Sequence, residues 1–147
     1  MRAVFASVVV ALLLAGCSDD GDASSTLPDP SGDAFHVRYQ RSGGFAGVQE
    51  DLRVAAGRRA TLATATAGEP QTTRFRLSEK AVDALRSAFR KAGWRQIHSP
   101  GSSAGCADCF VYRIAYQGRV VRFDSVTFPQ RLTPVVRRLD AIVDAHR

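Results

Sequence analysis

Apolar and polar residues alternate with a period of two in several short runs of this chain, and this pattern constrains the fold more than any other feature. The run Phe35–Arg41 places Phe35, Val37 and Tyr39 on one parity, and Phe110–Tyr116 repeats the pattern. A period of two predicts half-buried strands. Further strands are predicted at 48–54, 60–66, 71–77 and 119–124. The short, glycine-containing turns between most of these runs, such as Gln117-Gly118, favour antiparallel pairing.

Two segments have a helical period instead. Ser78 is a predicted N-cap, and Gly93 stands where a helix commonly ends. A second helix is predicted to begin with Thr133 as N-cap and Pro134 as its first residue. The predicted buried stripes are Val82, Leu85, Phe89 and Ala92 in the first helix, and Val135, Val136, Leu139, Ile142 and Val143 in the second. The expected fold is therefore α+β, a mainly antiparallel sheet with two helices packed on one face.

One residue interrupts the strand pattern. Glu50 has the same parity as Val48, Leu52 and Val54 in the run 48–54. Carboxylates are seldom buried, so we expect Glu50 to be exposed at a strand end or next to the preceding loop.

The first 34 residues differ in composition from the rest. Residues 1–16 have one basic residue and an apolar stretch, and Leu14–Cys17 is similar to the lipobox of bacterial lipoproteins. We therefore expect a lipoprotein signal peptide over 1–16, and an acylated Cys17, for example with palmitate, that holds the protein on the extracytoplasmic side of a cell membrane. A plain signal peptide with a coincidental cysteine is the alternative. Residues 17–34 contain five aspartates and no basic residue, which predicts a disordered acidic tether before the domain 35–147.

The domain itself is basic. Phe35–Arg147 carries 19 basic and nine acidic side chains, a net charge of about +10 with neutral histidines. Nucleic acid is not expected as a partner, because the chain is predicted to be exported and has no recognition motif. Anionic headgroups, an acidic protein surface and a solvated arginine-rich exterior all remain open.

Cys106 and Cys109 are the only cysteines after Cys17. In an exported protein such a pair predicts a disulfide, with a thiol–disulfide catalyst as the alternative. Redox motifs usually open a helix, whereas this pair precedes a predicted strand. Cys106, Cys109, Asp108 and His98 are near one another in sequence, but a zinc site would need a second ligand pair, so no metal is expected. No motif points to a cofactor or to a catalytic residue either.

The stretch Arg41–Gly47, with the sequence RSGGFAG, holds one aromatic residue among three glycines. Such a loop bends sharply and can present Phe45 outward. The alternative is a hairpin turn with Phe45 folded back onto the core.

This stretch resembles the emfourin family of protease inhibitors. The similarity extends through Phe75–Ser78, Phe110–Ile114, Gly118–Val121 and Pro129–Leu132. The resemblance implies a non-enzymatic inhibitor of secreted thermolysin-like zinc metallopeptidases, in which the zinc belongs to the target. The protease-binding residues implied by the match are Arg41, Ser42, Gly43, Gly44, Phe45, Ala46 and Gly47.

Two features of this chain depart from the family pattern, namely the lipobox with its tether and the cysteine pair. Two possibilities therefore stay open. The protein inhibits proteases at a membrane surface, or it has kept the fold of the family and lost the inhibitory activity. The rival hypothesis from another class is an envelope binding module whose basic face docks on anionic lipid or on another envelope protein.

Overall fold

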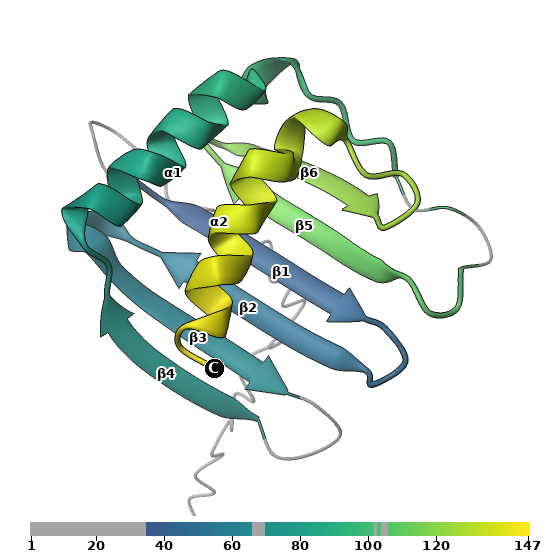
Figure 1. The fold of residues 1–147 in the computed structure, drawn as a ribbon, viewed down its shortest axis with the longest axis horizontal. Helices are drawn as coiled ribbons and strands as arrows, with labels where there is room; N and C mark the ends of the chain where they lie inside the picture. The colour runs from purple at the N-terminus through teal and green to yellow at the C-terminus, as the bar shows by residue number, and fades with distance from the viewer. Residues whose placement is uncertain (1–34, 66–69, 102, 104–105) are drawn as a thin grey trace, which may run out of the picture.

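The computed structural model describes residues 35–65, 70–101, 103 and 106–147. These residues form a six-stranded antiparallel sheet and two helices, and the predicted α+β class is confirmed (Figure 1). The strands are β1 Val37–Gly43, β2 Val48–Val54, β3 Arg59–Ala65, β4 Gln71–Arg76, β5 Phe110–Tyr116 and β6 Arg119–Asp124. Their order across the sheet is β4-β3-β2-β1-β5-β6.

Strand β1 lies between the strands β4, β3 and β2 on one side and β5 and β6 on the other. It pairs with β2, its neighbour in sequence, and with β5, which follows in sequence only after β2, β3, β4 and α1. Tyr39 stands opposite both Leu52 and Ile114, and all three side chains are fully buried. The predicted alternation is thus confirmed, because the shared parity of these residues faces one common core.

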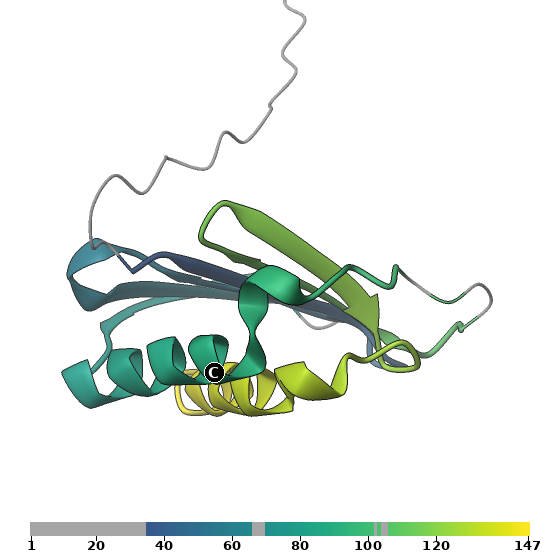
Figure 2. The same cartoon turned by 90° about the horizontal axis from the view of Figure 1, so that it is seen from above.

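Both helices cover the same face of the sheet (Figure 2). Helix α1 spans Glu79–Ala92, where the Ser78 hydroxyl accepts a 3.1 Å hydrogen bond from the Ala81 amide, as the predicted N-cap requires. Gly93 ends the helix in the left-handed conformation with φ 65°. The opposite face of the sheet carries no described helix.

Helix α2 spans Thr133–Asp144 and differs from the prediction at its start. A short 3-10 turn, Gln130–Leu132, continues directly into the helix, so that Leu132 occupies the N-cap position. Thr133 is already helical and makes no capping hydrogen bond through its side chain, so its prediction as N-cap was wrong. The buried residues of α2 are Val135, Val136, Leu139 and Val143, as its periodicity predicts, while Ile142 is only partly buried.

The exposed position predicted for Glu50 is also wrong. Glu50 is 4% exposed, because its parity directs it toward the helices together with Leu52. Arg41 stands directly opposite on β1 and supplies the compensating charge. A carboxylate is tolerated on a buried face only with such a partner.

Some predictions fall outside the described residues. These are the signal peptide, Cys17 and the acidic tether, all within 1–34, and most of the turn predicted at Gly68–Pro70. Within the part of the chain that the structure describes, neither α1 nor α2 is both long and apolar enough to cross a bilayer.

Candidate functional site

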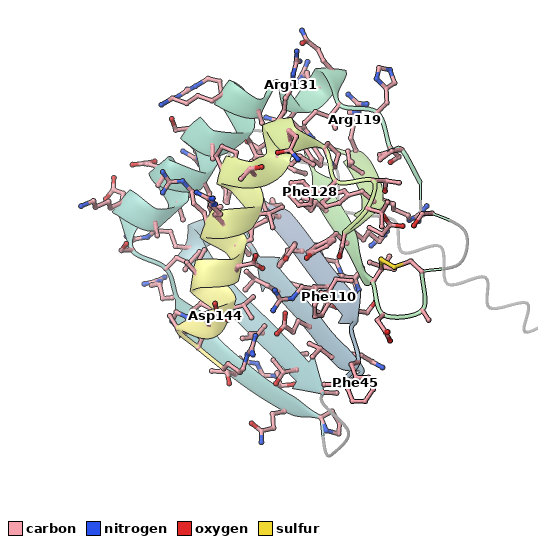
Figure 3. The ribbon with its side chains drawn as sticks, turned by 45° about the vertical axis from the view of Figure 1, so that its right-hand side comes forward. Phe45, Phe110, Arg119, Phe128, Arg131 and Asp144 are labelled. Carbon is pink, nitrogen blue, oxygen red and sulfur yellow. A yellow bond between two sulfur atoms is a disulfide. The ribbon has the colours of Figure 1, made fainter. Side chains whose placement is uncertain are left out.

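The loop Gly44–Gly47 joins β1 and β2 at one end of the sheet. The amide of Gly47 donates a 3.0 Å hydrogen bond to the carbonyl of Gly44, which closes a turn with Phe45 and Ala46 at its corners. Phe45 is 97% exposed, and Figure 3 shows its ring at the outer end of the hairpin. The alternative in which Phe45 folds back onto the core is therefore excluded.

Gly43 and Gly44 allow this turn to pack closely against the start of β5, where a residue with a Cβ atom would clash. Gly43 has φ 110°, and a Cβ atom there would collide with the carbonyl oxygen of Cys109. Gly44 has φ 69°, and its Cβ would lie 2.7 Å from the ring of Phe110. The turn therefore sits tightly against the start of β5, and only glycine combines a positive φ with this close approach.

Arg41 braces the base of the hairpin from the helix-covered face. Its Nε donates to Glu50 at 2.8 Å, its Nη1 donates to Asp140 at 3.2 Å, and its guanidinium carbon lies 5.3 Å from the Phe110 ring centroid. Burial opposes its charge, but the hydrogen bond to Glu50 and the surrounding groups outweigh burial and raise the pKa of Arg41. The side chain points toward α2, whereas Ser42 is exposed on the opposite face.

The brace extends through neighbouring groups. Arg147 donates to the second oxygen of Glu50 at 2.5 Å. The Tyr39 hydroxyl donates to Asp140 at 2.6 Å, and burial together with this carboxylate raises the pKa of Tyr39. Burial also raises the pKa of Asp140, although the Tyr39 hydrogen bond and the Arg41 charge act in the opposite direction. Arg41, Glu50, Tyr39 and Asp140 thus each have a partner of complementary chemistry.

The cysteine pair supports the loop from the other side. Cys106 and Cys109 lie at disulfide distance with Cα atoms 5.4 Å apart, and Figure 3 shows the bond between their sulfur atoms. The carbonyl of Cys109 accepts a 3.4 Å hydrogen bond from Gly44, and β5 begins with the next residue. The pair therefore stands at the start of β5 and beside the Gly44–Gly47 loop, where a disulfide would restrict the backbone that contacts Gly44.

A second exposed apolar tip at this end of the sheet was not foreseen from the sequence. Val126 follows β6 and is 68% exposed. Asp124 fixes this turn by accepting hydrogen bonds from the amides of Val126 at 2.9 Å and Thr127 at 2.7 Å. Hydrogen bonds from Ser103 and Thr127 also hold the pKa of Asp124 well below its usual range. An aspartate followed by Ser-Val-Thr is the local pattern that predicts such a turn.

The exposed large apolar residues are not scattered over the molecule. Among the described residues they are Phe45, Val111 and Val126. Val111 lies on β5, between the strands that carry the other two. Large side chains gathered in this way indicate an interaction surface more strongly than single exposed ones do.

Other candidate chemistry does not assemble in the described part of the chain. No three histidine, cysteine, aspartate or glutamate side chains there gather as metal ligands. His146 instead stacks on Phe75 with ring centroids 3.6 Å apart, and His98 lies exposed in the loop before Gly101.

No protein-family model matches the chain, and no curated protein matches it. The exposed loop and its supports therefore provide the observations from which a function can be inferred.

Proposed function

We propose that this domain inhibits thermolysin-like zinc metallopeptidases by inserting the Gly44–Gly47 loop into the active-site cleft. The observation that carries this proposal is the 97% exposure of Phe45 on a turn that is braced on both sides. The resemblance of Arg41–Gly47 to emfourin inhibitors points to the same enzyme class. The zinc in the complex would belong to the enzyme.

The loop has the physical properties of an inhibitory anchor. A fully exposed phenyl ring gains most when a partner pocket removes it from water, and central aromatic anchors dominate many interfaces. The close contact of Gly44 with Phe110 and the turn closed by Gly47 limit the loop's freedom before binding. Less conformational entropy is then lost on docking, which favours slow release.

The structural supports divide the predicted site residues into two groups. Phe45 and Ala46, the exposed corners, would contact the enzyme, and the backbone of Gly47 would follow them. Arg41 would act indirectly by holding the base of the hairpin through Glu50 and Asp140. Val126 would add a second apolar contact with the enzyme. It follows β6, which lies two strands from β1 and therefore roughly 10 Å from it.

Anchoring forms a separate part of the proposal. Acylation of Cys17 would hold the inhibitor on the extracytoplasmic side of the membrane, where it would meet secreted enzymes. Membrane fractionation of cells that express the full chain tests this, since Cys17→Ser should move the protein into the soluble fraction. An unchanged distribution would contradict lipid anchoring and leave the inhibition hypothesis untouched.

Inhibition itself is tested with the chain from Ser18 to Arg147, which contains every described element. Thermolysin, a serine protease and a cysteine protease are assayed with peptide substrates at increasing inhibitor concentration. We expect competitive inhibition of thermolysin alone. A chain that is folded by circular dichroism and inhibits no thermolysin-like enzyme at micromolar concentration overturns the proposal.

Variants then locate the anchor. Phe45→Ala should raise the inhibition constant by about 30-fold, which corresponds to about 2 kcal/mol for a hot-spot aromatic residue. The melting temperature should stay the same, because the ring contacts little of its own domain. Arg137→Ala, at an exposed position of helix α2, is the control and should change inhibition much less. Inhibition that survives Phe45→Ala unchanged would remove the loop from the mechanism.

A further inference from the structure

The face of the sheet that carries no described helix is rich in arginine. Strand alternation directs every second side chain to this face, and the register of the six strands identifies them. Seven arginines from all six strands share it, namely Arg38, Arg53, Arg59, Arg74, Arg76, Arg113 and Arg122. We call this surface the arginine face. Figure 2 shows both helices on the other side of the sheet.

Six of these arginines stand directly opposite one another on neighbouring strands. The three cross-strand pairs are Arg38–Arg53, Arg59–Arg76 and Arg113–Arg122. Like charges in directly opposed positions destabilise a sheet. Those pairs that have no carboxylate partner therefore cost folding stability, and a bound anion would offset that cost.

The acidic side chains of the arginine face do not neutralise it. Asp51 pairs with Arg38 at 2.7 Å and with Arg53 at 3.0 Å. Asp124 is 1% exposed and is occupied by Ser103 and the turn at Thr127.

Two of the like-charge pairs have no carboxylate partner in the described part of the chain. They are Arg59–Arg76 and Arg113–Arg122. Burial, together with the charges of Arg122 and Arg38, lowers the pKa of Arg113. The charge on this side of the sheet is therefore available to a partner.

The arginine face is also hollowed toward the end of the sheet that carries the Gly44–Gly47 loop. A shallow depression of about 450 Å³ lies over the short side chains of Ser42, Ala63 and Ala65. Arg113 and Arg122 border this depression, together with Gln40, Gln49 and Asp51. The carboxylate of Asp51 is already paired with Arg38 and Arg53. Arg113, Arg122 and the two amide side chains therefore offer donors and positive charge to an anionic group.

We propose that the arginine face docks on the surface of an anionic lipid bilayer. Seven guanidinium groups spread over six strands, about 25 Å at the usual strand spacing, match a planar and continuous negative charge. A specific protein partner would instead call for a compact patch with aromatic anchors. The described exposed apolar residues lie toward the loop end, and only Val111 belongs to this face.

Membrane docking is independent of the protease-inhibitor hypothesis. The Gly44–Gly47 loop extends from the end of the sheet (Figure 1). The arginine face is the flat side of the sheet opposite the helices. A domain that lies with this face on a bilayer keeps the loop between β1 and β2, which carries Phe45, at its edge. Both helices then lie away from the lipid. Both surfaces could therefore be occupied at once.

The experiment is co-sedimentation of the Ser18–Arg147 chain with vesicles. This chain omits the apolar segment 1–16, which would itself bind lipid. Vesicles contain either phosphatidylcholine alone or 30% phosphatidylglycerol in phosphatidylcholine, at low, physiological and 0.5 M NaCl. We expect binding to the anionic vesicles alone and release at high salt, because salt screens exposed charges.

A double variant locates the surface. Arg113→Gln with Arg122→Gln should weaken binding to anionic vesicles by about tenfold or more. The matched control, Arg137→Gln with Arg138→Gln, removes the same charge from exposed positions of α2 on the other side of the sheet and should change binding much less. Circular dichroism confirms that both variants are folded.

Three outcomes overturn the proposal. The first is an absence of binding to anionic vesicles at low salt. The second is an equal loss in the two double variants, which would indicate net charge alone. The third is tighter binding to poly-glutamate or to an oligonucleotide than to vesicles under the same conditions, which would assign the face to an acidic macromolecule.

Discussion

The two faces of this sheet contain charged residues that are balanced in different ways. On the helix-covered face, Glu50 is enclosed by Arg41 and Arg147, and Tyr39 donates to Asp140. On the arginine face, Arg113 stands opposite Arg122 without a carboxylate partner in the described part of the chain. Buried charges persist only when they are paired, whereas water screens exposed ones. The paired charges of the covered face therefore stabilise the fold, whereas the charges of Arg113 and Arg122 are available to a partner.

The largest expected effect is the removal of a charge from the covered face. Glu50→Ala leaves the mostly buried Arg41 guanidinium with Asp140 as its one remaining carboxylate partner among the described residues. We expect a loss of about 3 kcal/mol in the free energy of unfolding, measured by urea denaturation. Gln49→Ala, the exposed neighbour on the other face, should cost less than about 0.5 kcal/mol. Equal losses in the two variants would abolish the distinction between the faces.

A smaller loss is expected at the Tyr39–Asp140 contact. Tyr39→Phe removes the 2.6 Å hydrogen bond and keeps the ring in the core. A hydrogen bond to a charged group contributes about 1.5 kcal/mol, and the same denaturation experiment measures it. In the double variant with Asp140→Ala, the two losses should be less than additive, because each single change removes the Tyr39–Asp140 hydrogen bond, although Asp140→Ala also removes the ion pair with Arg41. Additive losses would contradict the contact.

The two faces should also respond to acid with opposite sign. Burial works to raise the pKa of Asp51, but the hydrogen bonds from Arg38 and Arg53 outweigh it and lower the pKa. Its contribution to stability is therefore present above the ordinary pKa, near 3.9, and is lost as the pH falls through the folded-state pKa. The pKa of Asp140 is raised, so its contribution is present at low pH and is lost as the pH rises through the folded-state value.

Measurement of unfolding free energy between about pH 2 and pH 5 tests these signs. Asp51→Asn should flatten the loss of stability on acidification, and Asp140→Asn should steepen it. Both changes should be smaller than the loss in Tyr39→Phe, because Asp51 is partly exposed and water screens its ion pairs. A steeper acid response in Asp51→Asn would reverse the assignment.

The smallest expected effect is a gain of stability on the arginine face. Arg122→Gln relieves repulsion with Arg113 and should stabilise the domain by a few tenths of a kcal/mol at low salt. The gain should vanish at 0.5 M NaCl, where exposed charges are screened. Arg137→Gln on α2 is the control and should change stability less. A loss of stability in Arg122→Gln would indicate that this charge serves the fold after all.

Much of the architecture could be predicted from local patterns. The periods of Phe35–Arg41 and Phe110–Tyr116 predicted strands, and the Ser78 cap with Gly93 predicted the bounds of α1. Local sequence was informative there because capping and turn conformations depend on residues a few positions apart. The glycines of Arg41–Gly47 likewise predicted a sharp bend.

The misjudged residues depended on distant parts of the chain. Glu50 has a parity that directs it inward, but its burial is possible only because Arg41 pairs across the sheet and Arg147 arrives from 97 residues away. Val126 has a local signal, because Asp124 followed by Ser-Val-Thr predicts a turn, but its place at the same end of the sheet as Phe45 depends on the pairing of β5 with β1 and β6.

The sequence by itself determined which segments are strands and helices, and which side chains share a face of each strand, because both follow from local backbone geometry. Only the tertiary structure decided that β5 lies beside β1, and hence that the arginines of six strands share one surface. Strand pairing joins residues far apart in the chain, so charge repulsion across the sheet becomes visible only after the register is known. The same pairing of β1 with β5 places the Phe110 ring against Gly44. The Phe45 side chain, at the corner of the turn, is exposed to solvent.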